Sequence, residues 1–249
     1  MDDHRLGAVI AMGSRSSVHE WVGGIVAKVP KPSTPEGWIR FEAAYVSAVQ
    51  RIGVAVPVFH GFASVGGRDV ALYERINGES MWESLRNEPG RAGELGSQLA
   101  SVHASLLGLV GPMALPSQHS RLRSKIRAAV QQSGSPTDAD LTALPDGEMM
   151  LCHGDLHPKN ILMAKNGPVV IDWFDACRGS AAADVARTRV LLRGSRDEVN
   201  PDHLRGISAP TIARFQATYL DQVLSITGLP VSSVDRWIPA QEAAQRGEQ

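Results

Sequence analysis

The chain has 249 residues, with 25 Lys and Arg, 26 Asp and Glu, and a formal net charge of −1 at pH 7. Its 43% hydrophobic and 20% charged residues are typical of a globular protein with one large domain or two modest ones. The near-neutral charge disfavours nucleic acid and anionic membranes as partners. No apolar run is long enough to span a bilayer. The polar start Met-Asp-Asp-His-Arg is unlike a signal peptide. We therefore expect a cytoplasmic protein.

The first third of the chain is expected to contain mainly strands and one helix. Strand-like runs at residues 8–11 and 18–22 are followed by Gly23-Gly24, a hairpin signal, and then by an apolar run at residues 26–29. Thr34-Pro35 predicts the start of a helix, because a capping residue precedes proline at the first helical position. An apolar stripe at helical spacing follows, made of Trp38, Phe41, Tyr45, Val49 and Ile52.

After Gly78 the pattern becomes mainly helical. The predicted helices are at residues 80–87, 91–107, 121–132, 181–192, 211–224 and 233–245, and short strands are predicted at 149–152, 161–164 and 169–171. Loops are predicted at residues 111–120 and 133–140 from their Gly, Pro, Ser and Asp content. Cys152 and Cys177 are expected to be reduced packing residues, and a disulfide between them is poorly motivated.

The residues that carry chemistry lie between positions 153 and 173. The segment reads His153-Gly154-Asp155-Leu156-His157-Pro158-Lys159-Asn160, and later Val169-Val170-Ile171-Asp172-Trp173. Phosphoryl transfer needs a carboxylate to orient the attacking hydroxyl and oxygen ligands to hold Mg²⁺ on the phosphates. Asp155 offers the first, and Asn160 and Asp172 offer the second. Their order and spacing indicate a kinase catalytic loop followed by a metal-binding aspartate.

Other interpretations of this segment stay open. Asp155 and Asn160 could be turn residues, and Asp172 could cap the end of a strand. The H-x-D-x-H alternation that ends at His157 could instead bind a metal, as in a His/Asp metallohydrolase. That alternative is weaker because Pro158 favours a turning loop over a strand, and no further ligand cluster stands out in the sequence.

The segment resembles the aminoglycoside phosphotransferase and choline kinase family, small-molecule relatives of the protein kinases. The family pattern H-G-D-x-H-x-x-N, followed by I-D-W/F, stands here as HGDLHPKNI and VVIDWFDA, and the likeness extends more weakly over most of the chain. It implies an α+β, protein-kinase-like fold with two lobes. Residues 1–76 would form a β-rich, nucleotide-binding lobe, and residues 77–249 a mainly helical lobe for catalysis and substrate, with nucleotide in the cleft between them.

The resemblance also implies an ion pair in the first lobe. A kinase holds the α- and β-phosphates with a lysine on a strand, here Lys28, and holds that lysine with a glutamate on a helix, here Glu42. Lys28 lies in an apolar run after the hairpin signal, which argues against a plain surface lysine. Glu42 borders the apolar stripe of the helix, and an ordinary solvated glutamate is the alternative.

Two backbone segments complete the implied nucleotide site. The loop at residues 12–18 contains Gly13, Ser14 and Ser16, which are small enough for N–H groups to approach phosphate oxygens. The strand and linker at residues 70–78 would present Glu74 and Ile76 to the adenine edge, and a plain strand and turn is the alternative. No G-x-x-x-x-G-K-[ST] is present, which excludes the P-loop class. ATP is the expected donor, and the sequence does not distinguish it from GTP.

Further residues near the motif receive roles from the resemblance. His157 and Asp175 would contact substrate or phosphate, although Asp175 could equally cap the next helix. His153 and Asp184 would support the catalytic loop. His103 lies on the apolar side of a predicted helix, and a satisfied core histidine is the stronger interpretation.

The acceptor is expected to be a hydroxyl group of a small molecule. Protein kinases are disfavoured because few residues separate Asp172 from the next predicted helix, and no A-P-E motif is present. Acidic and basic residues balance from Leu151 onward, which gives no support for a strongly acidic aminoglycoside pocket. Amino sugars, other antibiotics, amino alcohols, hydroxy amino acids and sugars stay open, as does a catalytically silent nucleotide-binding protein. The sequence does not predict the oligomeric state.

Overall fold

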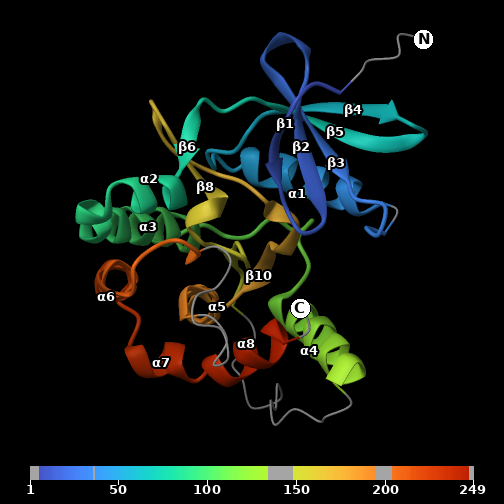
Figure 1. The fold of residues 1–249 in the computed structure, drawn as a ribbon. Coiled ribbons are helices and arrows are strands. Elements are labelled where there is room, and N and C mark those ends of the chain that lie inside the picture. Colours follow the sequence, from blue (N-terminus) through green and yellow to red (C-terminus); the bar gives the residue numbers. More distant parts are fainter. Residues whose placement is uncertain (1–5, 36, 134–147, 194–203, 247–249) are drawn as a thin grey trace.

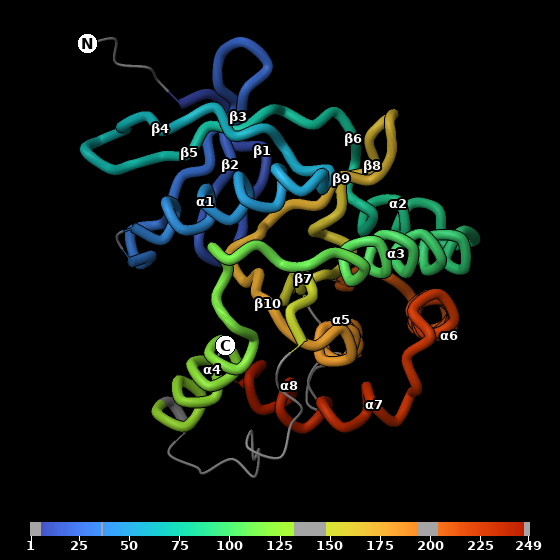
Figure 2. The backbone as a smooth tube through the Cα atoms, turned by 180° about the vertical axis from the view of Figure 1, so that it is seen from behind, coloured from blue at the N-terminus to red at the C-terminus, as the bar shows by residue number. Residues whose placement is uncertain are grey.

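The computed structural model describes residues 6–35, 37–133, 148–193 and 204–246 (Figure 1). A five-stranded antiparallel sheet with one helix lies at one end of the molecule, and most of the helices gather at the other (Figures 1 and 2). The predicted order, strands first and helices afterwards, is therefore confirmed. Within the described ranges, no helix has the length and apolar character needed to cross a membrane.

The N-terminal sheet has the strand order β1-β2-β3-β5-β4. Its strands are β1 (Val9–Met12), β2 (Ser16–Glu20), β3 (Ile25–Pro30), β4 (Phe59–Val65) and β5 (Arg68–Glu74). The predicted hairpin joins β2 to β3, and Gly23 and Gly24 in its turn have φ angles of 70° and 74°, which glycine adopts at no steric cost. Lys28 stands in the central strand, opposite Ala71 of β5.

Helix α1 (Trp38–Gln50) begins later than the sequence predicts. Gly37, with φ of 81°, precedes its first turn, and no side chain caps it. The Thr34 hydroxyl donates instead to the carbonyl of Arg15 at 2.6 Å, which ties the turn after β3 to the loop between β1 and β2. The predicted start at Thr34-Pro35 is therefore wrong, because Thr34 serves a tertiary contact rather than the helix.

The buried face of α1 is also rotated from the predicted stripe. Phe41 and Ile52 are 59% and 37% exposed. The buried positions of the helix are Trp38, Ile39, Glu42, Ala43, Val46, Ala48 and Val49. Glu42 thus lies inside the buried face, at 2% exposure, and not at its border. A buried carboxylate needs a partner, so the position of Glu42 already indicates an ion pair beneath the sheet.

The C-terminal region consists mainly of helices. These are α2 (Met81–Asn87), α3 (Ala92–Leu107), α4 (Gln118–Ser133), α5 (Ala181–Arg193), α6 (Ala209–Thr227), α7 (Val231–Asp235) and α8 (Ile238–Gln245). α3 packs along α6, α4 packs along α8, and α5 lies in the middle of the region (Figure 2). Ser80 and Glu83 form a capping box at the start of α2, which is why this boundary could be predicted closely.

Two small antiparallel sheets frame the motif segment. One has the order β6-β8-β9, with β6 (Gly78–Ser80), β8 (Ile161–Ala164) and β9 (Gly167–Val170), and the other pairs β7 (Met150–Cys152) with β10 (Cys177–Gly179). One-turn 3₁₀ helices lie at Val22–Gly24, Pro89–Arg91, Pro158–Asn160 and Trp173–Asp175. Cys152 and Cys177 are buried, free and in register across β7 and β10, as expected for packing residues.

Several predicted boundaries differ from the structure. α4 begins at Gln118, inside the loop predicted at residues 111–120. The helix predicted at residues 233–245 is two helices, α7 and α8. Pro239 lies in the first turn of α8 and has no N–H to bond to a preceding turn, so the helix restarts there. The loop predicted at residues 133–140 lies outside the described residues, apart from Ser133 at the end of α4.

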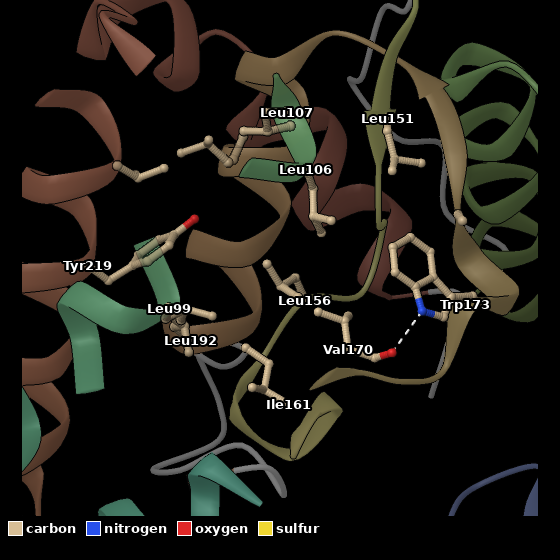
Figure 3. Close-up of a cluster of buried hydrophobic side chains, with 14 of the residues drawn as sticks. Leu99, Leu106, Leu107, Leu151, Leu156, Ile161, Val170, Trp173, Leu192 and Tyr219 are labelled. Atoms are coloured by element: carbon tan, nitrogen blue, oxygen red, sulfur yellow. Dashed lines mark hydrogen bonds between the residues drawn. The ribbon is translucent and has the colours of Figure 1, made fainter. Parts of the chain in front are cut away.

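A cluster of buried side chains joins the motif segment to the helices (Figure 3). Its labelled members are Leu99, Leu106, Leu107, Leu151, Leu156, Ile161, Val170, Trp173, Leu192 and Tyr219. Leu156 follows Asp155, and Trp173 follows Asp172, and both are fully buried. The Trp173 indole N–H donates to the Val170 carbonyl at 3.0 Å. Since burying one such side chain contributes about 1.5–3 kcal/mol, the core anchors both halves of the motif.

The close packing of α3 on α6 gives a test of the fold. A Cβ on Gly96 would lie 2.6 Å from the backbone oxygen of Phe215, whereas the nearest atom to a Cβ on Gly93 is in the side chain of Arg214, at 3.3 Å. We expect Gly96→Ala to lower the free energy of unfolding by about 1–3 kcal/mol, because backbone cannot give way without moving a helix. Gly93→Ala is the matched control and should leave the free energy of unfolding unchanged or slightly higher. Urea denaturation measures both, and equal effects would contradict the packing.

Candidate active site

Hydrogen bonds hold Asp155 in the loop that follows β7. Its backbone N–H donates to His153 Nδ1 at 3.2 Å. Asn160 Nδ2 donates to the backbone oxygen of Asp155 at 2.9 Å and to its Oδ2 at 3.2 Å. Asn160 ends the 3₁₀ turn that Pro158 begins, and it is buried. The predicted catalytic and metal-binding residues of the loop are therefore in direct contact.

His153 links this loop to the segment that contains Asp172. It is fully buried, and its Nε2 donates to the carbonyl of Ile171 at 3.1 Å. Burial lowers the pKa of His153, so the ring is neutral, and its two contacts require the proton on Nε2. The ring also packs edge-on against Trp173, with centroids 4.7 Å apart. His153 thus joins the two parts of the motif through hydrogen bonds, and the supporting role that the resemblance implies stays a prediction.

Two nitrogen-bearing side chains approach the Asp155 carboxylate. His157 Nε2 and Arg187 Nη2 each lie 3.5 Å from one of its oxygens. Burial alone would raise the pKa of Asp155, but His157 and then Arg187 hold it well below its usual range. The carboxylate is therefore ionised and can accept a hydrogen bond from a hydroxyl. Such a low pKa makes it better at orienting that hydroxyl than at keeping its proton.

Asp172 has an uncommon backbone conformation. With φ of 64° and ψ of 65°, it is the one non-glycine residue of positive φ in the described part of the chain. Aspartate tolerates this region better than most residues, and such conformations, at about 1–3 kcal/mol each, cluster at functional sites. The Ile171 N–H donates to the carbonyl of Asn160 at 3.0 Å, which holds Asp172 beside the loop. Its side chain is 44% exposed and so accessible to a ligand.

Lys28 connects the sheet to this segment. Its Nζ lies 2.5 Å from Glu42 Oε1 and 3.2 Å from Asp172 Oδ1. Burial would lower the pKa of Lys28, but Asp172 and Glu42 together raise it above its ordinary value. Burial raises the pKa of Glu42 to about 7, against the attraction of Lys28. The structure thus brings together three residues that are far apart in the sequence, with one lysine between two carboxylates.

Asp184 supports the loop from α5. Its buried carboxylate accepts the N–H groups of His153 at 2.8 Å and Gly154 at 2.9 Å, and it contacts His103 Nε2 at 3.2 Å. His103 Nδ1 also contacts the Tyr219 hydroxyl at 2.7 Å, so the prediction of a satisfied core histidine is confirmed. Burial would raise the pKa of Asp184, but its donors, His103 foremost, keep it below the ordinary value.

Asp175 is engaged by cations rather than by the start of α5. Its carboxylate lies 3.0 Å from Lys125 Nζ and 4.0 Å from Arg15 Nη1. Burial would raise the pKa of Asp175, but Lys125 lowers it. Its backbone packs on Gly154, where a Cβ would lie 2.3 Å from the Asp175 carbonyl oxygen. The capping role that the sequence left open for Asp175 is therefore replaced by an ion pair.

Sequence reasoning missed the cations of the site. They are Arg15, Arg121, Lys125 and Arg187. Helical spacing offered a signal for some of them, because residues three or four apart share a face. Arg187 lies one turn after Asp184 on α5, and Arg121 and Lys125 lie one turn apart on α4. Nothing in the local pattern, however, places α4 beside the motif.

The remaining predicted nucleotide contacts lie in the β1–β2 turn, at the end of β5 and in the linker that follows it. Gly13 and Ser14 form an exposed tight turn between β1 and β2, closed by the Gly13 N–H, which donates to the Ser16 carbonyl at 2.8 Å. Ser16 itself begins β2 and is buried, so the tip of the loop consists of residues 13–15. Glu74 ends β5, and Ile76 lies in the linker to β6. Their contacts with a nucleotide stay predictions.

Oxygen donors suited to Mg²⁺ come from Asn160 and Asp172. Among the residues that the structure describes, no group of three or more His, Cys, Asp or Glu side chains could hold a metal ion. The His/Asp metallohydrolase interpretation therefore has no support.

Asp184 gives a test of how far the loop depends on one buried carboxylate. Because its pKa is lowered on folding, its stabilisation is present above the ordinary Asp pKa and is lost as the pH falls through the folded-state value. We expect Asp184→Asn to lower the free energy of unfolding by about 3–5 kcal/mol at neutral pH, since a single amide oxygen cannot serve these donors. The difference from the wild type should shrink once the pH falls below about 4.

The matched control for this variant is Asp69→Asn. It removes an exposed carboxylate that lies 2.6 Å from the exposed Arg40, and exposed ion pairs contribute only about 0–1 kcal/mol. Urea denaturation across the acidic range measures both variants. A large loss that does not change with pH, or an equal loss in the control, would contradict this account of Asp184.

Comparisons with known proteins give the family and the fold of the chain. A family model described as the phosphotransferase enzyme family matches residues 13–218. The aminoglycoside-3′-phosphotransferase of type VIII is similar in structure, with a TM-score of 0.63 at 18% identity over 98% of this chain and 94% of that one. An aminoglycoside phosphotransferase from Streptomyces rimosus gives 0.60 at 16% identity, over 94% of this chain and 91% of that one. A choline kinase from Cryptosporidium parvum has a TM-score of 0.56 at 14% identity, over 97% of this chain and 82% of that one.

A search of curated proteins found no match. The structural likenesses show the fold, and they confirm the protein-kinase-like architecture that the sequence predicts. The family model covers most of the chain. The chain therefore belongs to the phosphotransferase enzyme family.

Proposed function

We propose that the protein transfers the γ-phosphate of ATP to a hydroxyl group of a small molecule. One observation carries the proposal. Asp155, Asn160 and the segment of Asp172 form one hydrogen-bonded unit, and Lys28 reaches that unit from the sheet at 3.2 Å. Phosphoryl transfer needs these residue types close together, and membership of the family supports a phosphotransferase.

The donor would bind between the sheet and the motif. Lys28, held by Glu42, would pair with the α- and β-phosphates. The loop that contains Gly13, Ser14 and Ser16 would cover the phosphates with N–H groups other than that of Gly13, which donates to Ser16. The linker at residues 74–76 would hold the base, with the lobe boundary between residues 76 and 77. A solved relative carries AMP-PNP and hygromycin B, and another carries GDP. These ligands support a nucleotide site and leave both ATP and GTP as donors to test.

Asn160 and Asp172 would hold Mg²⁺ on the phosphates. Asn160 uses its amide nitrogen for Asp155, which leaves its amide oxygen for a cation. The carboxylate of Asp172 is partly exposed, and both oxygens are the hard donors that Mg²⁺ prefers. When bound, Mg²⁺ would neutralise charge that develops on the phosphate oxygens.

Asp155 would orient the acceptor. Its ionised carboxylate accepts a hydrogen bond from the hydroxyl and aims the oxygen at the γ-phosphorus. The new O–P bond forms as the bond to the β-phosphate oxygen breaks, ADP leaves with that electron pair, and the hydroxyl proton passes through Asp155 to solvent. His157, at 3.5 Å from Asp155, and Asp175 would contact the acceptor or the transferred phosphate. The names of the relatives suggest amino sugars and amino alcohols among the acceptors to test.

Asp155→Asn tests the chemical step. We expect kcat to fall by about 100- to 10,000-fold, because a neutral amide neither orients the hydroxyl as an ionised carboxylate does nor passes its proton to solvent, while MgATP still binds. A coupled assay for ADP and calorimetry with MgATP measure the two quantities. Asp221→Asn, an exposed aspartate on α6, is the matched control and should change neither. Unchanged turnover in the Asp155 variant would exclude the assigned role, and a wild type that binds MgATP without any turnover would be a silent relative.

Asp172→Asn tests the metal site. We expect the Mg²⁺-dependent part of nucleotide binding to weaken by about 10- to 100-fold, since a carboxylate ligand is lost, while metal-free ATP should bind both proteins alike. Thermal-shift titrations with ATP in Mg²⁺ or EDTA report this through ligand stabilisation of the native state. A zinc-selective chelator should have no effect on the wild type. Equal Mg²⁺ dependence in the two proteins would remove Asp172 from the metal site.

A further inference from the structure

The acceptor would reach Asp155 from the side of α4. β6 and α2, which follow the linker at residues 74–76, lie on one side of the molecule in Figure 1, and α4 lies on the other; the reverse view in Figure 2 agrees. α4 meets the motif segment through Lys125, whose Nζ is 3.0 Å from Asp175 Oδ1. With the base of the nucleotide at the linker, the opposite end of the cleft is left to the acceptor.

Three cationic side chains lie at that end. Arg15 and Lys125 both approach Asp175, at 4.0 and 3.0 Å. Arg15 and Arg121 both lie over the ring of Phe174, with guanidinium carbons 5.4 and 5.0 Å from its centroid. We call Arg15, Arg121 and Lys125 the cation cluster. Lys125 also lowers the pKa of Asp155, so the three positive charges of the cluster face the two carboxylates of Asp155 and Asp175.

Within the described part of the chain, no carboxylate pairs with Arg121. Its guanidinium donates to the carbonyl of Phe174 and lies over the rings of Phe174 and Tyr45. Its Nε is buried, and among the described residues it has no acceptor. A buried N–H without an acceptor is unfavourable, and an oxygen from a ligand would remove that cost. Guanidinium groups bind carboxylates and phosphates through paired N–H donors.

We propose that the acceptor carries an oxyanion, a carboxylate or a phosphate ester, in addition to the hydroxyl that is phosphorylated, and that the cation cluster binds this oxyanion. The inference rests on the proposed function and names its substrate class. A polycationic acceptor would meet three like charges here, which disfavours it. The donor phosphates have Lys28 on the sheet, whereas Arg121, whose Nε has no acceptor among the described residues, lies on α4 at the side proposed for the acceptor.

The first experiment compares acceptors of one carbon skeleton that carry an anionic, a neutral or a cationic group. One series is glucuronate, glucose 6-phosphate, glucose and glucosamine, and a shorter one is glycerate, glycerol phosphate, glycerol and serinol. We expect kcat/KM of the wild type for the best anionic member to exceed that for the cationic member by about 100-fold. The two oxyanions in each series separate carboxylate from phosphate recognition. A higher kcat/KM for the cationic members, or the same kcat/KM for anionic, neutral and cationic members, would overturn the inference. Either result would leave the phosphotransferase proposal intact.

The second experiment uses Arg121→Gln, with Arg123→Gln as its matched control. Arg123 lies on the same helix but is exposed. We expect Arg121→Gln to reduce kcat/KM for the anionic acceptor by about 100-fold, mainly through a higher KM. The ratio of kcat/KM for the anionic acceptor to that for the neutral acceptor should fall by the same factor. Arg123→Gln should stay within about twofold of the wild type. A variant that loses affinity for MgATP but keeps its acceptor preference would assign Arg121 to the donor and overturn the inference. Absence of MgATP binding in the folded wild type would instead refute the proposed function.

Discussion

The candidate site depends on the hydrogen bonds that the buried carboxylate of Asp184 accepts from the loop. It accepts the N–H groups of His153 and Gly154, so the loop takes its conformation from helix α5 rather than from its own sequence alone. A carboxylate at 1% exposure is costly unless its lone pairs are used, and His103 uses one more of them. Because Asp155 follows directly, α5 determines where an attacking hydroxyl would be held.

From this point, backbone and side-chain hydrogen bonds join the two halves of the motif. His153 and Asn160 both contact the segment around Ile171, and Trp173 is anchored in the core. These constraints maintain the left-handed conformation of Asp172, which would otherwise relax. These contacts tie the site to the helical side, and Lys28 on β3 and Arg15 between β1 and β2 connect it to the sheet.

The motif could be predicted from the sequence because Asp155, His157 and Asn160 lie within a few residues of one another, whereas the groups that hold the loop from Ile171 and Asp184 are distant in the sequence. The orientation of α1 could not, because Phe41 looks like a core residue yet is exposed, and the buried position of Glu42 depends on Lys28 across the sheet. Arg121 and Lys125 were missed for the same kind of reason. Their helix reaches the motif through tertiary packing on α8, which no local pattern records.

The two ends of the proposed site are unbalanced in charge in opposite senses. At the donor end, Lys28 stands between Glu42 and Asp172, so one lysine faces two carboxylates, and burial raises the pKa of Glu42 to about 7. A divalent cation at Asp172 would supply the missing positive charge. At the other end, the three positive charges of the cation cluster face the two carboxylates of Asp155 and Asp175. Buried charges are tolerated when they are paired, so each end lacks the charge that its proposed ligand would bring, Mg²⁺ at one and an oxyanion at the other.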